Sequence, residues 1–96
     1  MRIAVSVDDM NHIAAHLGRC KIFHIYGKEG DHVELLEVIK TAGVHTDHII
    51  EEILDCHVVI SGQIGEGMIR SLRKRKIRPY IELDTIDPME AVKKIY

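Results

Sequence analysis

The stretch Val58-Val59-Ile60-Ser61-Gly62-Gln63-Ile64-Gly65-Glu66-Gly67 decides the fold class of this chain of 96 residues. The β-branched run from His57 to Ser61 predicts a buried strand of the kind found in parallel sheets. Gly62 to Gly67 then predicts a glycine-rich loop. An apolar stripe at helical spacing predicts a helix from Met68 to Arg75. A strand, a loop and a helix in this order begin a βαβ unit.

The residues on either side of this stretch continue the alternation of helix and strand. Before it, the apolar residues Ile49, Ile50, Ile53 and Leu54 recur at helical spacing and predict a helix, with Thr46 or Asp47 as its N-cap. After it, Arg78 to Leu83 predicts a strand whose early Pro79 indicates an edge position. Pro88, preceded by Asp87 as the N-cap, predicts a last helix that runs through Ile95.

The N-terminal part of the chain has the shorter period of strands. Arg2 to Val7 predicts a strand with Ile3, Val5 and Val7 on one face, and Asp8 to Cys20 predicts a loop. Lys21 to Tyr26 and His32 to Ile39 predict two more strands. The turn residues Gly27 to Asp31 lie between them, so these two strands form a hairpin.

The predicted order is therefore β-β-β-α-β-α-β-α. An antiparallel start followed by βαβ units implies an α/β fold with a mixed sheet covered by helices. The right-handed crossover rule places the first, fourth and fifth strands side by side and parallel. With 96 residues there is no room for a second core, so residues 1–96 are expected to form a single domain.

Composition narrows the classes of partner. The net charge of -2 gives no overall attraction to nucleic acid or to anionic lipid, and aromatic residues for base stacking make up only 4%. No apolar run is long enough to span a membrane, and the N-terminus lacks a signal peptide, so a cytoplasmic location is expected. Two cysteines are too few for a disulfide framework, and Cys56 is expected to be buried.

His16-Leu17-Gly18-Arg19-Cys20, with His12 four residues earlier, is the first segment that could carry chemistry. It offers an imidazole and a thiol as metal ligands and a guanidinium as an anion clamp. The alternative is a turn with a buried cysteine and a surface arginine.

The second segment that could carry chemistry is Gly62 to Gly67, where glycines before a helix allow backbone N–H groups to approach an anion. The alternative there is a tight turn between strand and helix.

Three further groups each have two interpretations. His45 and His48 have a spacing that can share a metal ion, but residues at a helix start are commonly solvated. Asp8 and Asp9 follow the first strand, where they either bind Mg²⁺ or cap the loop. The basic run from Arg70 to Arg78 is either a solvated helix end or a patch for a phosphate or a protein partner.

Taken together, these segments resemble the dinitrogenase iron-molybdenum cofactor biosynthesis family. The similarity covers nearly the whole chain. Its residues are Ile3-Ala4-Val5-Ser6-Val7-Asp8-Asp9, His16-Leu17-Gly18-Arg19-Cys20 followed by Phe23-His24-Ile25-Tyr26, Val58 to Met68, and Ile77-Arg78-Pro79-Tyr80. The family's usual first motif has phenylalanine where this chain has Leu17, which is also apolar. The resemblance implies a ribonuclease-H-like, three-layer fold with a five-stranded mixed sheet.

The resemblance also implies a role related to nitrogen fixation: a non-catalytic protein that binds the iron-molybdenum cofactor or an iron-sulfur cluster and passes it on. The residues that match the family's first motif are His16, Gly18, Arg19 and Cys20. The resemblance implies that Cys20 or His16 would coordinate iron and that Gly18 would belong to the same binding site. Arg19 and the loop amides would offset the negative charge of the cluster. The facing wall would be formed by Gly62, Gly65 and Gly67. The implied partners are the metal cluster and a protein that donates or accepts it.

Two other classes of function stay open at this point. One is a small regulatory or interaction domain that binds an anionic ligand or a partner protein. The other is a Mg²⁺-dependent, nuclease-like enzyme, because the implied fold also occurs in nucleases; Asp8 lies at a suitable strand end, but no second and third carboxylates are apparent.

Overall fold

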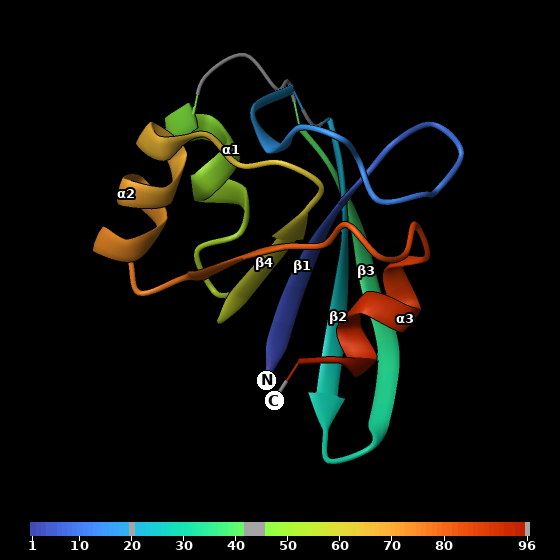
Figure 1. The fold of residues 1–96 in the computed structure, drawn as a ribbon. Coiled ribbons are helices and arrows are strands. Elements are labelled where there is room, and N and C mark those ends of the chain that lie inside the picture. Colours follow the sequence, from blue (N-terminus) through green and yellow to red (C-terminus); the bar gives the residue numbers. More distant parts are fainter. Residues whose placement is uncertain (20, 42–45, 96) are drawn as a thin grey trace.

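The computed structural model describes residues 1–19, 21–41 and 46–95. Their strands form one sheet in the order β3-β2-β1-β4-β5 (Figure 1). The strands are β1 (Arg2–Val7), β2 (Ile22–Glu29), β3 (His32–Lys40), β4 (Val58–Ser61) and β5 (Arg78–Ile81). The helices are α1 (Thr46–Glu52), α2 (Glu66–Lys74) and α3 (Pro88–Lys93), and a 3-10 turn spans Leu17–Arg19.

The central strand β1 joins the two halves of the sheet. It pairs antiparallel with β2 and parallel with β4, and β4 pairs parallel with β5. The mixed sheet, the hairpin and the parallel set β1-β4-β5 are therefore confirmed, as is the edge position of β5. Residues 58–61 of β4 are all buried, as a strand covered on both faces requires.

The two faces of the sheet carry two separate cores. Phe23 and Ile25 of β2 pack in one core with residues of α1 and α2, including Ile50 and Leu72. The predicted face of β1, with Ile3, Val5 and Val7, lies in the other core together with residues of α3. Figure 1 shows α1 and α2 on one side of the sheet and α3 on the other. The result is the three-layer, ribonuclease-H-like arrangement.

The hairpin turn is shorter than the sequence predicts. Strand β2 continues through Gly27 to Glu29, and the chain reverses at Gly30 and Asp31. Gly30 has a φ of +58°, a conformation that glycine adopts without steric cost. Gly27 stays in the strand, where a Cβ would lie 3.1 Å from the side chain of Leu36.

Several predicted helix limits are wrong. Helix α1 already includes Thr46 and Asp47, so neither is its N-cap, and Leu54 follows the helix with 52% of its surface exposed. Helix α2 begins at Glu66 rather than Met68, because the N-cap is Gly65. The hydrophobic stripe marks the buried positions of a helix, and the first two residues of α2, Glu66 and Gly67, are exposed and carry no such signal.

The C-terminal limits also differ. Strand β5 ends at Ile81, and Leu83 is 81% exposed. Helix α3 begins as predicted, with the Asp87 carboxylate accepting a hydrogen bond of 3.0 Å from the N–H of Met89. It ends at Lys93, and the ammonium group of Lys28 on β2 donates to the carbonyl oxygens of Val92 and Lys93 at this end. A cation there complements the helix dipole.

No helix within the described ranges is long and apolar enough to cross a membrane.

Candidate functional site

The loop after β1 is organised by Asp8. Its Oδ1 accepts hydrogen bonds from the N–H groups of Met10 and His12, at 2.9 and 3.0 Å. The loop also contains Asn11 with a φ of +62°. Asp8 is therefore a loop-capping carboxylate, and its Oδ1 is already in use. This favours the structural interpretation of Asp8 over the Mg²⁺ site of a nuclease.

The next residues bind back onto the sheet. The N–H of Ala14 donates to the carbonyl of Ser6 in β1 at 2.8 Å, and the N–H of Ile13 donates to the carbonyl of Ile86 at 2.8 Å. This path is extended, with a bridge between Val7 and Ile13, so His12 and His16 do not share a helix face. The segment instead crosses the carboxyl ends of β1 and β4.

Two backbone hydrogen bonds join this segment to the loop between β4 and α2. The N–H of Gly62 donates to the carbonyl of Ala14 at 2.9 Å, and the N–H of Leu17 donates to the carbonyl of Gln63 at 3.0 Å. Leu17, which stands in the place of the family's phenylalanine, is completely buried in the core with α1 and α2. Its side chain anchors the turn that follows His16.

Gly62 allows this close approach of the two loops. A Cβ at this position would lie 3.0 Å from the carbonyl oxygen of Ala14 and 3.2 Å from the Cα of Ala15. Both atoms belong to the backbone, so they cannot move aside as a flexible side chain can. Gly62 therefore has a packing role at this junction, and its predicted role in ligand binding stays a prediction.

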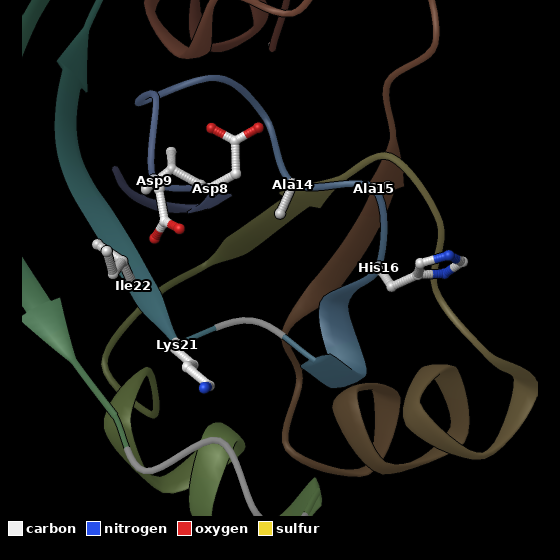
Figure 2. Close-up of a pocket in the computed structure, with 8 residues that line it drawn as sticks. Asp8, Asp9, Ala14, Ala15, His16, Lys21 and Ile22 are labelled. Carbon is white, nitrogen blue, oxygen red and sulfur yellow. The ribbon is translucent and has the colours of Figure 1, made fainter.

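A cavity of about 340 Å³ lies where the two loops meet, and its lining consists of His16, Gly18, Gln63 and Gly65. A second cavity, of about 370 Å³, lies on the side of His16 that faces the end of β1, with Asp8, Asp9 and Lys21 in its wall. Figure 2 shows the imidazole of His16 pointing away from Asp8 and Asp9. His16 lines both cavities, and the one that it shares with Gln63 and Gly65 lies between the two predicted motifs. We call it the His16 cavity.

Gly65 brings the start of α2 to the wall of this cavity. It is the N-cap of the helix, with extended backbone (φ -67°, ψ 155°) and without a side-chain cap. Uncapped N–H groups at a helix start favour a negative charge. Gly67 lies in the first turn of α2 and does not line the cavity. The exposed carboxylate of Glu66 in the same turn reduces the positive potential there.

The structure thus brings together His16, Gly18 and Gly65 from the two predicted motifs. The sequence did not point to Gln63. This residue lines the cavity, and its backbone carbonyl accepts the hydrogen bond from the N–H of Leu17. Nothing in the sequence singles out a glutamine in a polar loop, because its importance comes from a contact between distant segments.

Several predicted residues are not placed. Cys20 and His45 lie outside the described residues, as do the side chains of Arg19 and His48. Their predicted roles remain predictions. Within the described ranges, no three histidine, cysteine, aspartate or glutamate side chains are grouped so that they could hold a metal ion.

Cys56 is buried, as predicted, and lies in the core beside α1 and α2. Burial, and to a lesser extent the neighbouring carboxylate of Asp55, raises the pKa of the Cys56 thiol to about 11. Nδ1 of the adjacent His57 accepts a hydrogen bond of 3.0 Å from the N–H of Arg2. The thiol of Cys56 stays protonated at neutral pH, which favours a structural role for this residue, and one of the two imidazole nitrogens of His57 is engaged with the backbone.

Comparison with known proteins agrees with this architecture. The family model for the dinitrogenase iron-molybdenum cofactor family matches residues 1–96. The chain belongs to this family. None of the curated proteins compared with it matches.

Three solved structures show the same fold. The crystal structure of PH0822 is 24% identical, with a TM-score of 0.75 over 84% of this chain and 78% of that chain. A candidate dinitrogenase from Methanocaldococcus jannaschii is 21% identical, with a TM-score of 0.70 over 97% and 85%. A candidate NifB protein from Thermotoga is 22% identical, with a TM-score of 0.63 over 95% and 83%. At these identities the similarity concerns the fold.

Proposed function

We propose that this domain binds a preassembled iron-sulfur or iron-molybdenum cluster in the His16 cavity and passes it to another protein without catalysing a reaction. Membership of the dinitrogenase iron-molybdenum cofactor family supports a role in cluster handling. The observation that carries the location is the single cavity lined by His16 and Gly18 of the first motif and by Gly65 of the second.

The chemistry of the cavity wall fits an anionic cargo. His16 is exposed and offers an imidazole, a ligand that suits iron. The uncapped start of α2 at Gly65 offers backbone N–H groups to negative charge. We propose Cys20 as a second ligand and Arg19 as a counter-charge because they directly follow Gly18 in the first motif.

A small number of protein ligands suits a carrier. A cluster that arrives with its own sulfides needs only one or two bonds from the protein. An open site with few bonds releases its cargo more readily than a closed one, because each bond adds to the free energy of binding.

The test is anaerobic reconstitution with iron and sulfide, or with extracted iron-molybdenum cofactor, followed by desalting. We expect retained visible charge-transfer absorption and a constant ratio of iron to protein. We expect the His16→Ala and Cys20→Ser variants to change the spectrum and to lose most of the bound iron. His16 is exposed, so its removal leaves the unfolding midpoint nearly unchanged.

His12→Ala is the matched control, because His12 lies in the same loop and does not line the His16 cavity. It should bind the cluster as the parent does. An identical spectrum for the parent, His16→Ala and Cys20→Ser would show that the site is wrong. A colourless, iron-free parent would show that the carrier function is wrong and would favour a regulatory or interaction domain.

A further inference from the structure

A strongly basic surface lies at the opposite end of α2 from the His16 cavity. Six exposed cationic residues follow one another closely at the end of α2 and the start of β5. We call them the basic surface: Arg70, Arg73, Lys74, Arg75, Lys76 and Arg78. Sequence alone leaves open whether this run is a solvated helix end or a binding patch.

Three of these cations converge on one open cavity. Arg73, Lys76 and Arg78 line a hollow of about 320 Å³ together with Ile77 and Pro79. Within the part of the chain that the structure describes, the side chains of Arg73 and Lys76 form no hydrogen bond or ion pair. These two charges are thus available for an anionic partner.

The backbone of Lys76 adopts a conformation that is unfavourable for a residue with a side chain. Its φ is +61°, in the left-handed region. The N–H of Lys76 donates to the carbonyl of Arg73 at 3.1 Å, and the N–H of Ile77 donates to the carbonyl of Leu72 at 2.9 Å. This pair of bonds is the Schellman motif, whose left-handed residue is usually glycine. A lysine in a conformation that favours glycine is consistent with a use for its ammonium group.

The neighbouring sheet edge offers few donors for an added strand. The N–H groups of Arg78 and Glu82 donate inward, to carbonyls next to and at the end of β4. Strand alternation therefore directs the nitrogens of Pro79 and Ile81 to the free edge, and Pro79 has no hydrogen to donate. Contacts with a partner here would therefore come mainly from side chains, and Lys76 and Arg78 place two cations at the start of this strand.

We propose that the basic surface docks an acidic segment of a partner protein, the donor or acceptor of the cluster. The partner's identity rests on the proposed function. Helix α2 has nine residues, so the docked segment would lie roughly 12 Å from the His16 cavity. Exchange of a cargo needs fast and reversible contact, which complementary charge provides. Among the described residues, no aromatic side chain lines the hollow, which argues against stacking of nucleic acid bases.

The test uses the cluster-free protein and a fluorescein-labelled twelve-residue peptide of alternating glutamate and serine. Fluorescence anisotropy at low salt should show binding that weakens steeply as salt is added. We expect the double variant Arg73→Gln and Lys76→Gln to bind about tenfold more weakly. Lys76→Gly should also weaken binding. This variant is expected to be more stable than the parent, because glycine adopts the backbone conformation of position 76 without strain, so weaker binding would not come from unfolding.

The matched control is the double variant Lys40→Gln and Lys93→Gln, which changes the net charge equally on β3 and α3. Peptide binding by this control should equal that of the parent. Equal weakening in both double variants, or no binding by the parent at low salt, would overturn the proposal. Tighter binding of a single-stranded oligonucleotide of equal charge through Arg73 and Lys76 would also overturn it. Because no cluster is present, these results do not depend on the outcome of reconstitution.

Discussion

The N–H of Gly62 donates a hydrogen bond of 2.9 Å to the carbonyl oxygen of Ala14, and this bond joins the two loops that form the candidate site. The hydroxyl of Ser61 donates to the same carbonyl oxygen at 3.3 Å. The carbonyl oxygen of Ala14 thus accepts two hydrogen bonds, from Ser61 and Gly62, and these fix the segment that contains His16 to the end of β4. The geometry of the His16 cavity depends on this junction.

Gly62→Ala should therefore destabilise the protein and disturb the site. The new Cβ would meet the backbone of Ala14 at 3.0 Å, so the loops must separate. We expect a loss of about 1–3 kcal/mol in the free energy of unfolding, measured by urea denaturation and circular dichroism.

Gly67→Ala is the control for this change. A Cβ at Gly67 meets no atom within 4 Å, and the residue is helical in α2. We expect a gain of up to about 1 kcal/mol, because alanine is the better helix former. Equal losses in the two variants would show that the contact with Ala14 is not the cause.

Lys76→Gly should stabilise the protein. Glycine adopts the left-handed backbone of position 76 without the clash of a Cβ. We expect a gain of about 1 kcal/mol in the free energy of unfolding. Lys74→Gly, at the last position of α2, should instead lose up to about 1 kcal/mol, since glycine is a poor helix former. A loss in both variants would contradict the cost assigned to Lys76.

The carboxylate of buried Glu82 pairs with the ammonium of Lys94 at 2.9 Å and links the end of β5 to the end of α3. The hydrogen bond from Lys94 holds the pKa of Glu82 below its ordinary value. A carboxyl group with a lowered pKa stabilises the fold above its unfolded pKa, and this contribution is lost as pH falls through the folded pKa.

Glu82→Gln should therefore lower the thermal midpoint at pH 7, and the difference from the parent should shrink as the pH falls below the ordinary glutamate range. Thermal unfolding at several pH values measures this. Glu90→Gln, which removes an exposed pair with Lys93, should have a small effect throughout. A difference for Glu82→Gln that stays constant down to strongly acidic pH would contradict the role of this charge.

The raised pKa of Cys56 should make its thiol unreactive in the folded protein. At pH 8 a thiol with a pKa of about 11 is about one part in a thousand ionised. In Cys20→Ser protein, where Cys56 is the remaining thiol, we expect alkylation roughly a hundredfold slower when folded than when unfolded in denaturant. Similar rates in both states would show that the thiol is accessible.

The same shift has a consequence for stability in alkali. A thiol whose pKa is raised on folding contributes stability below its unfolded pKa, and this contribution disappears as pH rises towards the folded value of about 11. Cys56→Ala should therefore lose less stability than the parent between pH 8 and pH 11. Identical alkaline profiles would contradict the effect of burial on this group.

The sequence by itself determined the order of the elements and the faces that they bury. Alternation in β1 and the apolar run of β4 are local signals, because the side-chain period follows directly from strand geometry. The preference for right-handed crossovers then predicted the order of the parallel strands. Sequence predicted the limits of α1 and α2 less well, since exposed turns such as Glu66-Gly67 carry no apolar signal.

Only the tertiary structure decided which residues form a site. His16 and Gly65 are far apart along the chain, and the sheet places β1 and β4 side by side, so the loops at their carboxyl ends meet. Tertiary structure also separated the roles of the glycines: Gly62 packs against Ala14, while Gly65 faces the cavity. The physical reason is that periodicity reports the burial of each residue, whereas a site depends on contacts between segments that local patterns do not contain.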